Sequence, residues 1–186
     1  MSQSRAVLLL RGVNVGGANK VVMADLRELL TGLGLADVVT VGNSGNAVFA
    51  TDASTHLDTL AQTVTTALAE HLEVTSSCVV RTDSQVRAAL AGDPFTDLTV
   101  GVDKAGSRML LLFTSADPTA TQLARHDPRT LDPARVALGA RVIYQWCPGG
   151  ILAAPDVSTA VRRGWGVEVT GRNRNTVEKL VARFDT

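Results

Sequence analysis

Residues 6–20, AVLLLRGVNVGGANK, place a continuous apolar run directly before a segment rich in glycine and asparagine. The run over residues 6–10 is typical of a buried strand. Residues 12–20 then predict a loop. Apolar residues at helical spacing follow it, with Gly34 suited to the C-terminal cap: Met23, Leu26, Leu29, Leu30 and Leu33. The chain therefore begins with a strand, a loop and a helix.

The rest of the first half continues this alternation. Apolar runs at residues 38–41 and 47–50 flank a Gly/Asn turn and predict a hairpin. A helix capped by Ser54 and a strand over residues 74–81 are expected next. A capping-box pattern, Thr82 with Gln85, then predicts a short helix that ends near Gly92. The order β-α-β-β-α-β is ferredoxin-like.

The second half predicts a similar unit. A strand is expected at 108–113, a helix at 118–125 after Asp117, and a hairpin over 135–146 that turns at Gly139-Ala140. A helix at 157–162 and an edge strand at 167–170 follow. The last helix has an apolar face made by Val177, Leu180, Val181 and Phe184. The fold class is therefore α+β, with two ferredoxin-like subdomains, residues 1–93 and 94–186, packed as one unit.

Composition excludes several classes of protein. The 186 residues are 45% hydrophobic, with 18 Lys+Arg against 18 Asp+Glu, which excludes a disordered chain and a strongly basic nucleic-acid coat.

Cys78 and Cys147 form no CxxC or Cys/His cluster, so we expect no metal site, no disulfide and no cofactor. The N-terminal apolar run is too short for a membrane span. We expect a cytoplasmic protein that does not bind membranes.

The glycine-rich loop RGVNVGGANK, residues 11–20, is the most conspicuous feature. A glycine-rich turn between a strand and a helix can direct backbone N–H groups at an anion. The loop contains neither a Walker A motif nor GxGxxG. It is therefore either a ligand-binding loop or a structural turn.

Two more polar segments have the same two interpretations. Residues 42–46, GNSGN, resemble a nucleophile elbow, but the context of strand, turn and strand favours a tight hairpin. In residues 170–176, TGRNRNT, Asn173 or Asn175 is suited to cap the last helix. Arg172 and Arg174 lie where they oppose the helix dipole, which favours either a bound anion or an acidic partner within the protein.

These segments also resemble a bacterial family known as domain of unknown function 1697. The similarity rests on LLRGVNVGG (Leu9 to Gly17) with Lys20, Val21 and Met23, on Ser44-Gly45-Asn46 with Val48-Phe49, on Asp93-Pro94-Phe95, and on Arg172-Asn173, Asn175-Thr176 and Lys179-Leu180. The resemblance implies two ferredoxin-like subdomains. It implies no established activity, substrate or cofactor.

We therefore predict a module that binds a small anionic ligand, phosphate-bearing or nucleotide-like, in a polar cleft. The expected ligand-binding residues are Arg11, Asn14, Gly16, Gly17, Lys20, Ser44, Asn46, Arg172, Asn173 and Asn175. An enzyme acting on such a ligand is the first alternative, although no nucleophile–base pair is evident. An RRM-like RNA-binding module is the second, and the few aromatic residues disfavour it. A purely structural or partner-binding role is the third.

Overall fold

The computed structural model describes residues 4–16, 19–52 and 54–186. They form a mixed α+β fold that contains two four-stranded antiparallel sheets. The chain divides into two compact units, Met1–Val86 with Lys179–Thr186, and Arg87–Glu178. The division falls inside the two helices α3 (Asp83–Ala91) and α8 (Arg174–Phe184). The expected boundary after residue 93 stays a prediction.

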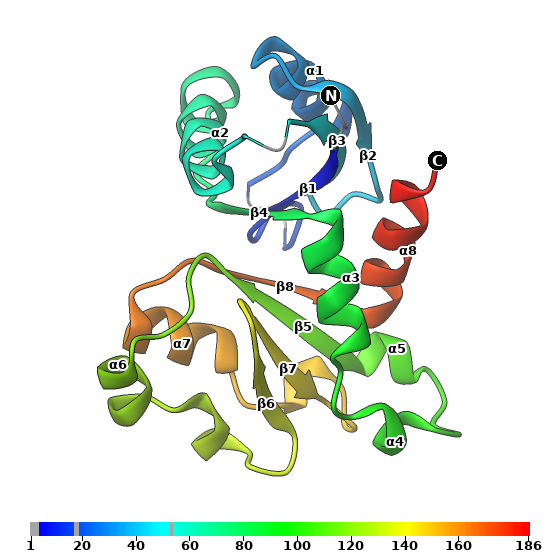
Figure 1. The fold of residues 1–186 in the computed structure, drawn as a ribbon, viewed down its shortest axis with the longest axis vertical. Coiled ribbons are helices and arrows are strands. Elements are labelled where there is room, and N and C mark those ends of the chain that lie inside the picture. Colours follow the sequence, from blue (N-terminus) through cyan, green and yellow to red (C-terminus); the bar gives the residue numbers. More distant parts are fainter. Residues whose placement is uncertain (1–3, 17–18, 53) are drawn as a thin grey trace. The chain divides into compact units, whose positions relative to one another are not determined.

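The first unit contains one sheet and the helices that cover it (Figure 1). Its elements are β1 (Ser4–Leu10), α1 (Met23–Gly32), β2 (Ala36–Thr40), β3 (Asn46–Thr51), α2 (Leu57–Leu72) and β4 (Cys78–Thr82). The strands lie in the order β2-β3-β1-β4. Since β1 is central, its C-terminal end and the loop that follows lie beside the start of β3 and the start of β4.

The core of this unit follows from the alternation of side chains along β1. Ala6, Leu8 and Leu10 lie on one face of the sheet, and they form a buried cluster with residues of α1 and α2. Leu26 and Leu30 contribute from α1, where helical spacing places them on one face. The loop after β1 is thereby anchored at both ends, by a buried strand and by a packed helix.

The second unit also contains a four-stranded sheet, together with additional short helices (Figure 1). Its elements are α4 (Thr96–Thr99), α5 (Ala105–Arg108), β5 (Met109–Thr114), α6 (Ala120–Arg125), the 3-10 helix η1 (Pro128–Leu131), β6 (Val136–Gly139), β7 (Val142–Trp146), the 3-10 helix η2 (Ile151–Ala153), α7 (Val157–Trp165) and β8 (Val169–Asn173). The strand order is β6-β7-β5-β8. Val161 and Trp165 of α7 pack against Leu112 and Ile143 of the sheet.

Two expected boundaries in the first unit are wrong. Ser54 does not cap α2, because the Thr55 N–H donates to the Asp52 carbonyl and the helix begins only after His56. The strand predicted from Val74 begins at Cys78. The Val74 N–H donates instead to the Leu68 carbonyl, which closes the C-terminal end of α2.

Two local predictions in the second unit also need correction. Gly139 pairs with Val142, so the hairpin turns at Ala140-Arg141, and Gly139 is needed because a Cβ there would lie 2.8 Å from the Val142 side chain. The helix expected from Pro118 begins at Ala120, because Thr119 forms a capping box with Gln122. The Asp117 carboxylate accepts a hydrogen bond from the Arg141 N–H.

Among the described residues, no helix is long and apolar enough to cross a membrane. The cytoplasmic location stays a prediction.

Candidate functional site

The side chain of Asn14 organises the loop after β1. Its Oδ1 accepts the Val21 N–H at 2.9 Å, and its Nδ2 donates to the Val21 carbonyl at 2.9 Å and to the Asn43 carbonyl at 2.7 Å. These bonds use both amide hydrogens and the carbonyl oxygen. Asn14 therefore joins the two ends of the loop and fastens the loop to the turn before β3. Its amide positions the loop, and its hydrogens are not left for a ligand.

The turn Gly42–Gly45 packs closely against the end of β1. The Gly45 carbonyl accepts the Leu10 N–H at 2.8 Å, and Gly45 has φ +68° with Leu10 Cβ only 2.6 Å from where its own Cβ would lie. Asn46 is 1% exposed, and its Nδ2 donates to the Val41 carbonyl. Asn46 thus fixes the turn from inside, whereas Ser44 is exposed at its tip.

The start of β4 completes this end of the sheet. The Arg11 N–H donates to the Ser77 carbonyl at 2.9 Å, and the buried Ser76 hydroxyl donates to the Arg11 carbonyl at 2.8 Å. Sequence reasoning missed Ser76, since a lone serine before a strand carries no distinguishing pattern. The backbone of Arg11 is fixed from both sides, so the guanidinium emerges from a rigid position.

The charged side chains of the two loop segments at this end of the sheet, residues 11–22 and 41–46, are all basic. Arg11 and Lys20 reach the surface, and within the described part of the chain neither has an ion pair with an acidic residue. Residues 11–22 and 41–46 contain no Asp or Glu. The arrangement offers hydrogen-bond donors and positive charge, and these segments contain no histidine to act as a base for Ser44. Gly17, which we also expected here, lies outside the described residues.

Arg172, Asn173 and Asn175 belong to the second unit. Arg172 is 8% exposed on β8, where its Nη1 donates to Thr170 Oγ1 and to the Gly171 carbonyl. Burial lowers the pKa of Arg172 to about 10. Asn173 caps α8, since its Oδ1 accepts the Thr176 N–H at 2.9 Å. The convergence of all three polar segments stays a prediction.

Asn175 and Arg174 make contacts inside the second unit. Asn175 packs against Gly106, whose Cβ would clash with the Asn175 amide. Arg174 Nη1 donates to Asp93 Oδ2 at 2.9 Å, and its Nε donates to Glu178 at 3.0 Å. The Asp93 side chain is 1% exposed. An acidic partner within the protein therefore satisfies Arg174, and the role of Asp93 was missed because 81 residues separate the pair.

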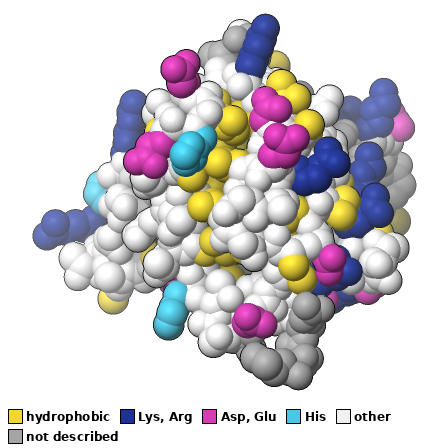
Figure 2. All heavy atoms as spheres, turned by 90° about the horizontal axis from the view of Figure 1, so that it is seen from above, with side chains coloured by type: hydrophobic (Ala, Val, Ile, Leu, Met, Phe, Trp, Pro, Cys, Tyr) yellow, Lys and Arg dark blue, Asp and Glu magenta, His cyan; other side chains and the backbone are white. Residues whose placement is uncertain are grey.

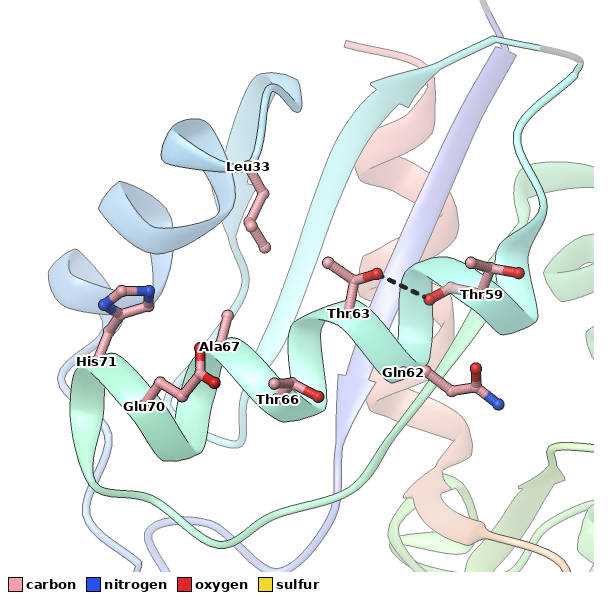
Figure 3. Close-up of a pocket in the computed structure, with 8 residues that line it drawn as sticks. All are labelled: Leu33, Thr59, Gln62, Thr63, Thr66, Ala67, Glu70 and His71. Atoms are coloured by element: carbon pink, nitrogen blue, oxygen red, sulfur yellow. Dashed lines mark hydrogen bonds between the residues drawn. The ribbon is translucent and has the colours of Figure 1, made fainter.

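A groove in the first unit lies between the end of α1 and α2 (Figure 3). It has a volume of about 400 Å³ and is lined by Leu33, Thr59, Gln62, Thr63, Thr66, Ala67, Glu70 and His71. Thr63 Oγ1 donates to the Thr59 carbonyl. Glu70 and His71 are adjacent on α2 and do not face each other. The groove thus contains no acid–base pair.

No metal centre is evident in the parts of the chain that the structure describes, since no group of three or more potential ligands occurs there. The face drawn in Figure 2 exposes hydrophobic side chains together with basic, acidic and histidine side chains, and several of the Lys and Arg side chains lie toward its right side.

Comparison with known proteins identifies the family of this α+β chain and a protein of similar fold. The sequence pattern of a family described as "Protein of unknown function (DUF1697)" matches residues 3–144. The chain belongs to this DUF1697 family. No curated protein matches it. A conserved bacterial protein, SP0830 from Streptococcus pneumoniae, is similar in fold, with a TM-score of 0.70, 24% identity and 100% of both chains covered.

Proposed function

We propose that this DUF1697 protein binds a small phosphate-bearing anion at the loop end of its first sheet. The observation that carries the proposal is a pair of surface cations, Arg11 and Lys20, on one loop. The hydrogen bonds of Asn14, and that of Ser76 to the Arg11 carbonyl, hold this loop in place. Two cations close in sequence attract an anion. Their segments contain no acidic residue that would compete with the anion for them.

The backbone supports the same function. Gly12, Asn14 and Gly16 have positive φ, whereas Val13 and Val15 between them do not. These conformations turn the chain tightly, and the Asn14 N–H donates to the Asn19 carbonyl at 3.1 Å, so the backbone donors to an anion are the other N–H groups of the loop. A Cβ at Gly12 or Gly16 would meet nothing within 4 Å, so the surface of the loop is open. Arg11 adds a side-chain donor beside it.

Binding is favoured over catalysis by the chemistry of these residues. A hydrolase or transferase needs a base within hydrogen-bond reach of a nucleophile or a water. Ser44 has no histidine or carboxylate in its segment or in the loop after β1. The residues supply recognition of a phosphate through charge and hydrogen bonds.

A thermal-shift screen tests this function with nucleotides, sugar phosphates, acyl-CoA and short RNA as separate probes. A probe at 100 times its Kd stabilises the fold by about 2.7 kcal/mol, a shift in Tm of roughly 5–10 °C for a chain of this size. We expect Arg11→Ala and Lys20→Ala to abolish the shift. Arg27→Ala is the matched control, because Arg27 is an exposed cation on α1 outside the loop. Equal shifts in all three variants would refute the site.

We also infer that each unit is ferredoxin-like. The orders β2-β3-β1-β4 and β6-β7-β5-β8 support this, because each sheet places its first and third strands side by side in the interior. Interstrand NOEs by NMR test the assignment. Contacts between Ala6 and Thr82 and between Leu110 and Asn173 are expected, and their absence would contradict it.

A further inference from the structure

Among its described residues, the first unit exposes large hydrophobic side chains at two positions, and both lie in the loop after β1. Val15 is 69% exposed and Val22 is 61% exposed. Their neighbours Val13 and Val21 are buried in the core of the unit. Single exposed valines are common on protein surfaces. Here, however, both exposed valines share one segment with the two cations of the proposed anion site.

Hydrogen bonds bring the two valines to the same part of the loop. The Asn14 side chain bonds to the N–H and to the carbonyl of Val21, at 2.9 Å each, which fixes Asn14 and Val21 side by side. Val15 follows Asn14, and Val22 follows Val21. Lys20 directly precedes Val21 and belongs to the same part of the loop. The loop therefore combines an apolar surface with positive charge.

Helix α1 gains little from a valine at position 22. Val22 is the N-cap residue of α1, and it makes no side-chain capping hydrogen bond. Ser, Thr, Asn and Asp are strongly preferred at this position, and valine is among the least favourable residues there. Because Val22 is also exposed, it contributes little to the core. Its side chain is therefore available for a contact with a ligand.

We propose that the anion bound by this loop is a phosphomonoester with a short aliphatic group, which Val15 and Val22 cover while Arg11 and Lys20 bind the phosphate. This inference rests on the proposed function and names the class of ligand. A valine side chain has no hydrogen-bonding group, so it favours hydrocarbon over the hydroxyls of a sugar. Residues 11–22 contain no aromatic side chain on which a nucleobase could stack, or which could anchor the loop at a membrane surface.

NMR titration of the full chain with methyl phosphate and butyl phosphate tests the proposal. Each methylene that the valines bury should lower the Kd by about threefold to fourfold. We therefore expect butyl phosphate to bind about 10-fold more tightly than methyl phosphate. The methyl signals of Val15 and Val22 should shift more with butyl phosphate than with methyl phosphate.

A double variant, Val15→Ser with Val22→Ser, removes the apolar surface and should bind the two esters with the same Kd. Both positions are exposed and serine is a favoured N-cap residue, so this variant should fold normally. Val100→Ser is the matched control, because Val100 is a 79% exposed valine of the second unit. It should keep the preference for butyl phosphate.

The outcomes separate this inference from the function on which it rests. Equal Kd values for the two esters in wild type, or a preference that survives in the double variant, would leave the anion site intact and overturn the aliphatic ligand. If neither ester nor inorganic phosphate bound, the anion site itself would fail, and the inference with it. Sedimentation with phosphatidylglycerol vesicles supplies a third arm. Vesicle binding that the double variant loses would assign the valines to a membrane surface and overturn the proposal.

Discussion

The polar loop of the first unit and the β8–α8 junction of the second contain the same kinds of residue and use them differently. Both combine arginine with asparagine between a strand and a helix. At the junction, Asp93 and Glu178 hold Arg174, and Asn173 caps the helix. In the loop, Asn14 bonds only to backbone, and Arg11 and Lys20 have no acidic partner among the described residues. Whether a cation near the start of a helix stabilises the fold therefore depends on whether the chain supplies an acidic partner for it.

The largest expected effect concerns the packing that holds the loop of the first unit. Gly45→Ala forces a side chain into φ +68° and places its Cβ 2.6 Å from Leu10 Cβ. Backbone strain of about 1–2 kcal/mol and overpacking of about 1–3 kcal/mol should together lower the free energy of unfolding by about 3–4 kcal/mol. Urea denaturation measures it.

Gly42→Ala is the matched control for that measurement. Gly42 also has positive φ, +64°, but a Cβ there meets nothing within 4 Å. Only the strain of about 1–2 kcal/mol should appear. If the two variants were equally destabilised, close packing against Leu10 would not be what holds the loop end of the sheet.

The next largest effect is expected at the β8–α8 junction, where Arg174 pairs with Asp93. Arg174→Ala leaves the carboxylate of Asp93 buried without its cation, and we expect a loss of about 3 kcal/mol in the free energy of unfolding. Glu178→Ala removes the exposed partner of the same guanidinium and should cost less than about 0.5 kcal/mol. A small effect of Arg174→Ala would mean that the junction is not held by its ion pair, and the contrast between the two regions would fail.

Contacts between residues close in sequence could be predicted, whereas contacts between distant residues could not. The capping box of Thr82 with Gln85 was predicted and is present, because both partners lie within one turn. The start of β4 was misplaced because Val74 completes the end of α2, a choice that apolar character alone does not reveal. The Asp93–Arg174 pair could not be found, since nothing local links residues so distant in sequence.

A smaller effect, with a pH signature, is expected at Tyr144 in the second unit. Its hydroxyl donates to the Ala89 carbonyl at 2.8 Å, so Tyr144→Phe should cost about 1 kcal/mol at neutral pH. Burial, with the charge of Asp93, raises the pKa of Tyr144 to about 12. Because the folded state favours the neutral phenol, its contribution is complete below pH 10 and is lost between pH 10 and 12.

Urea denaturation at several pH values from about 9 to 11 measures that signature. Stability of wild type should fall more steeply than that of Tyr144→Phe above pH 10. Parallel profiles would show that another group is responsible. Cys147→Ala serves as the control. Because the pKa of the Cys147 thiol is raised from 9.0 to about 11, the stability that it contributes is lost from about pH 9 upward, at a lower pH than the contribution of Tyr144.

The smallest expected effect decides whether the two regions differ as described. Lys20 is exposed and has no acidic partner within the described residues, so Lys20→Ala should change the free energy of unfolding by less than about 0.5 kcal/mol. Arg174→Ala, measured beside it in urea, supplies the contrast. A loss above about 1 kcal/mol for Lys20→Ala would assign this cation a structural role like that of Arg174. A cation that stabilises nothing in the free protein remains available, by its charge, for an anion that the protein binds.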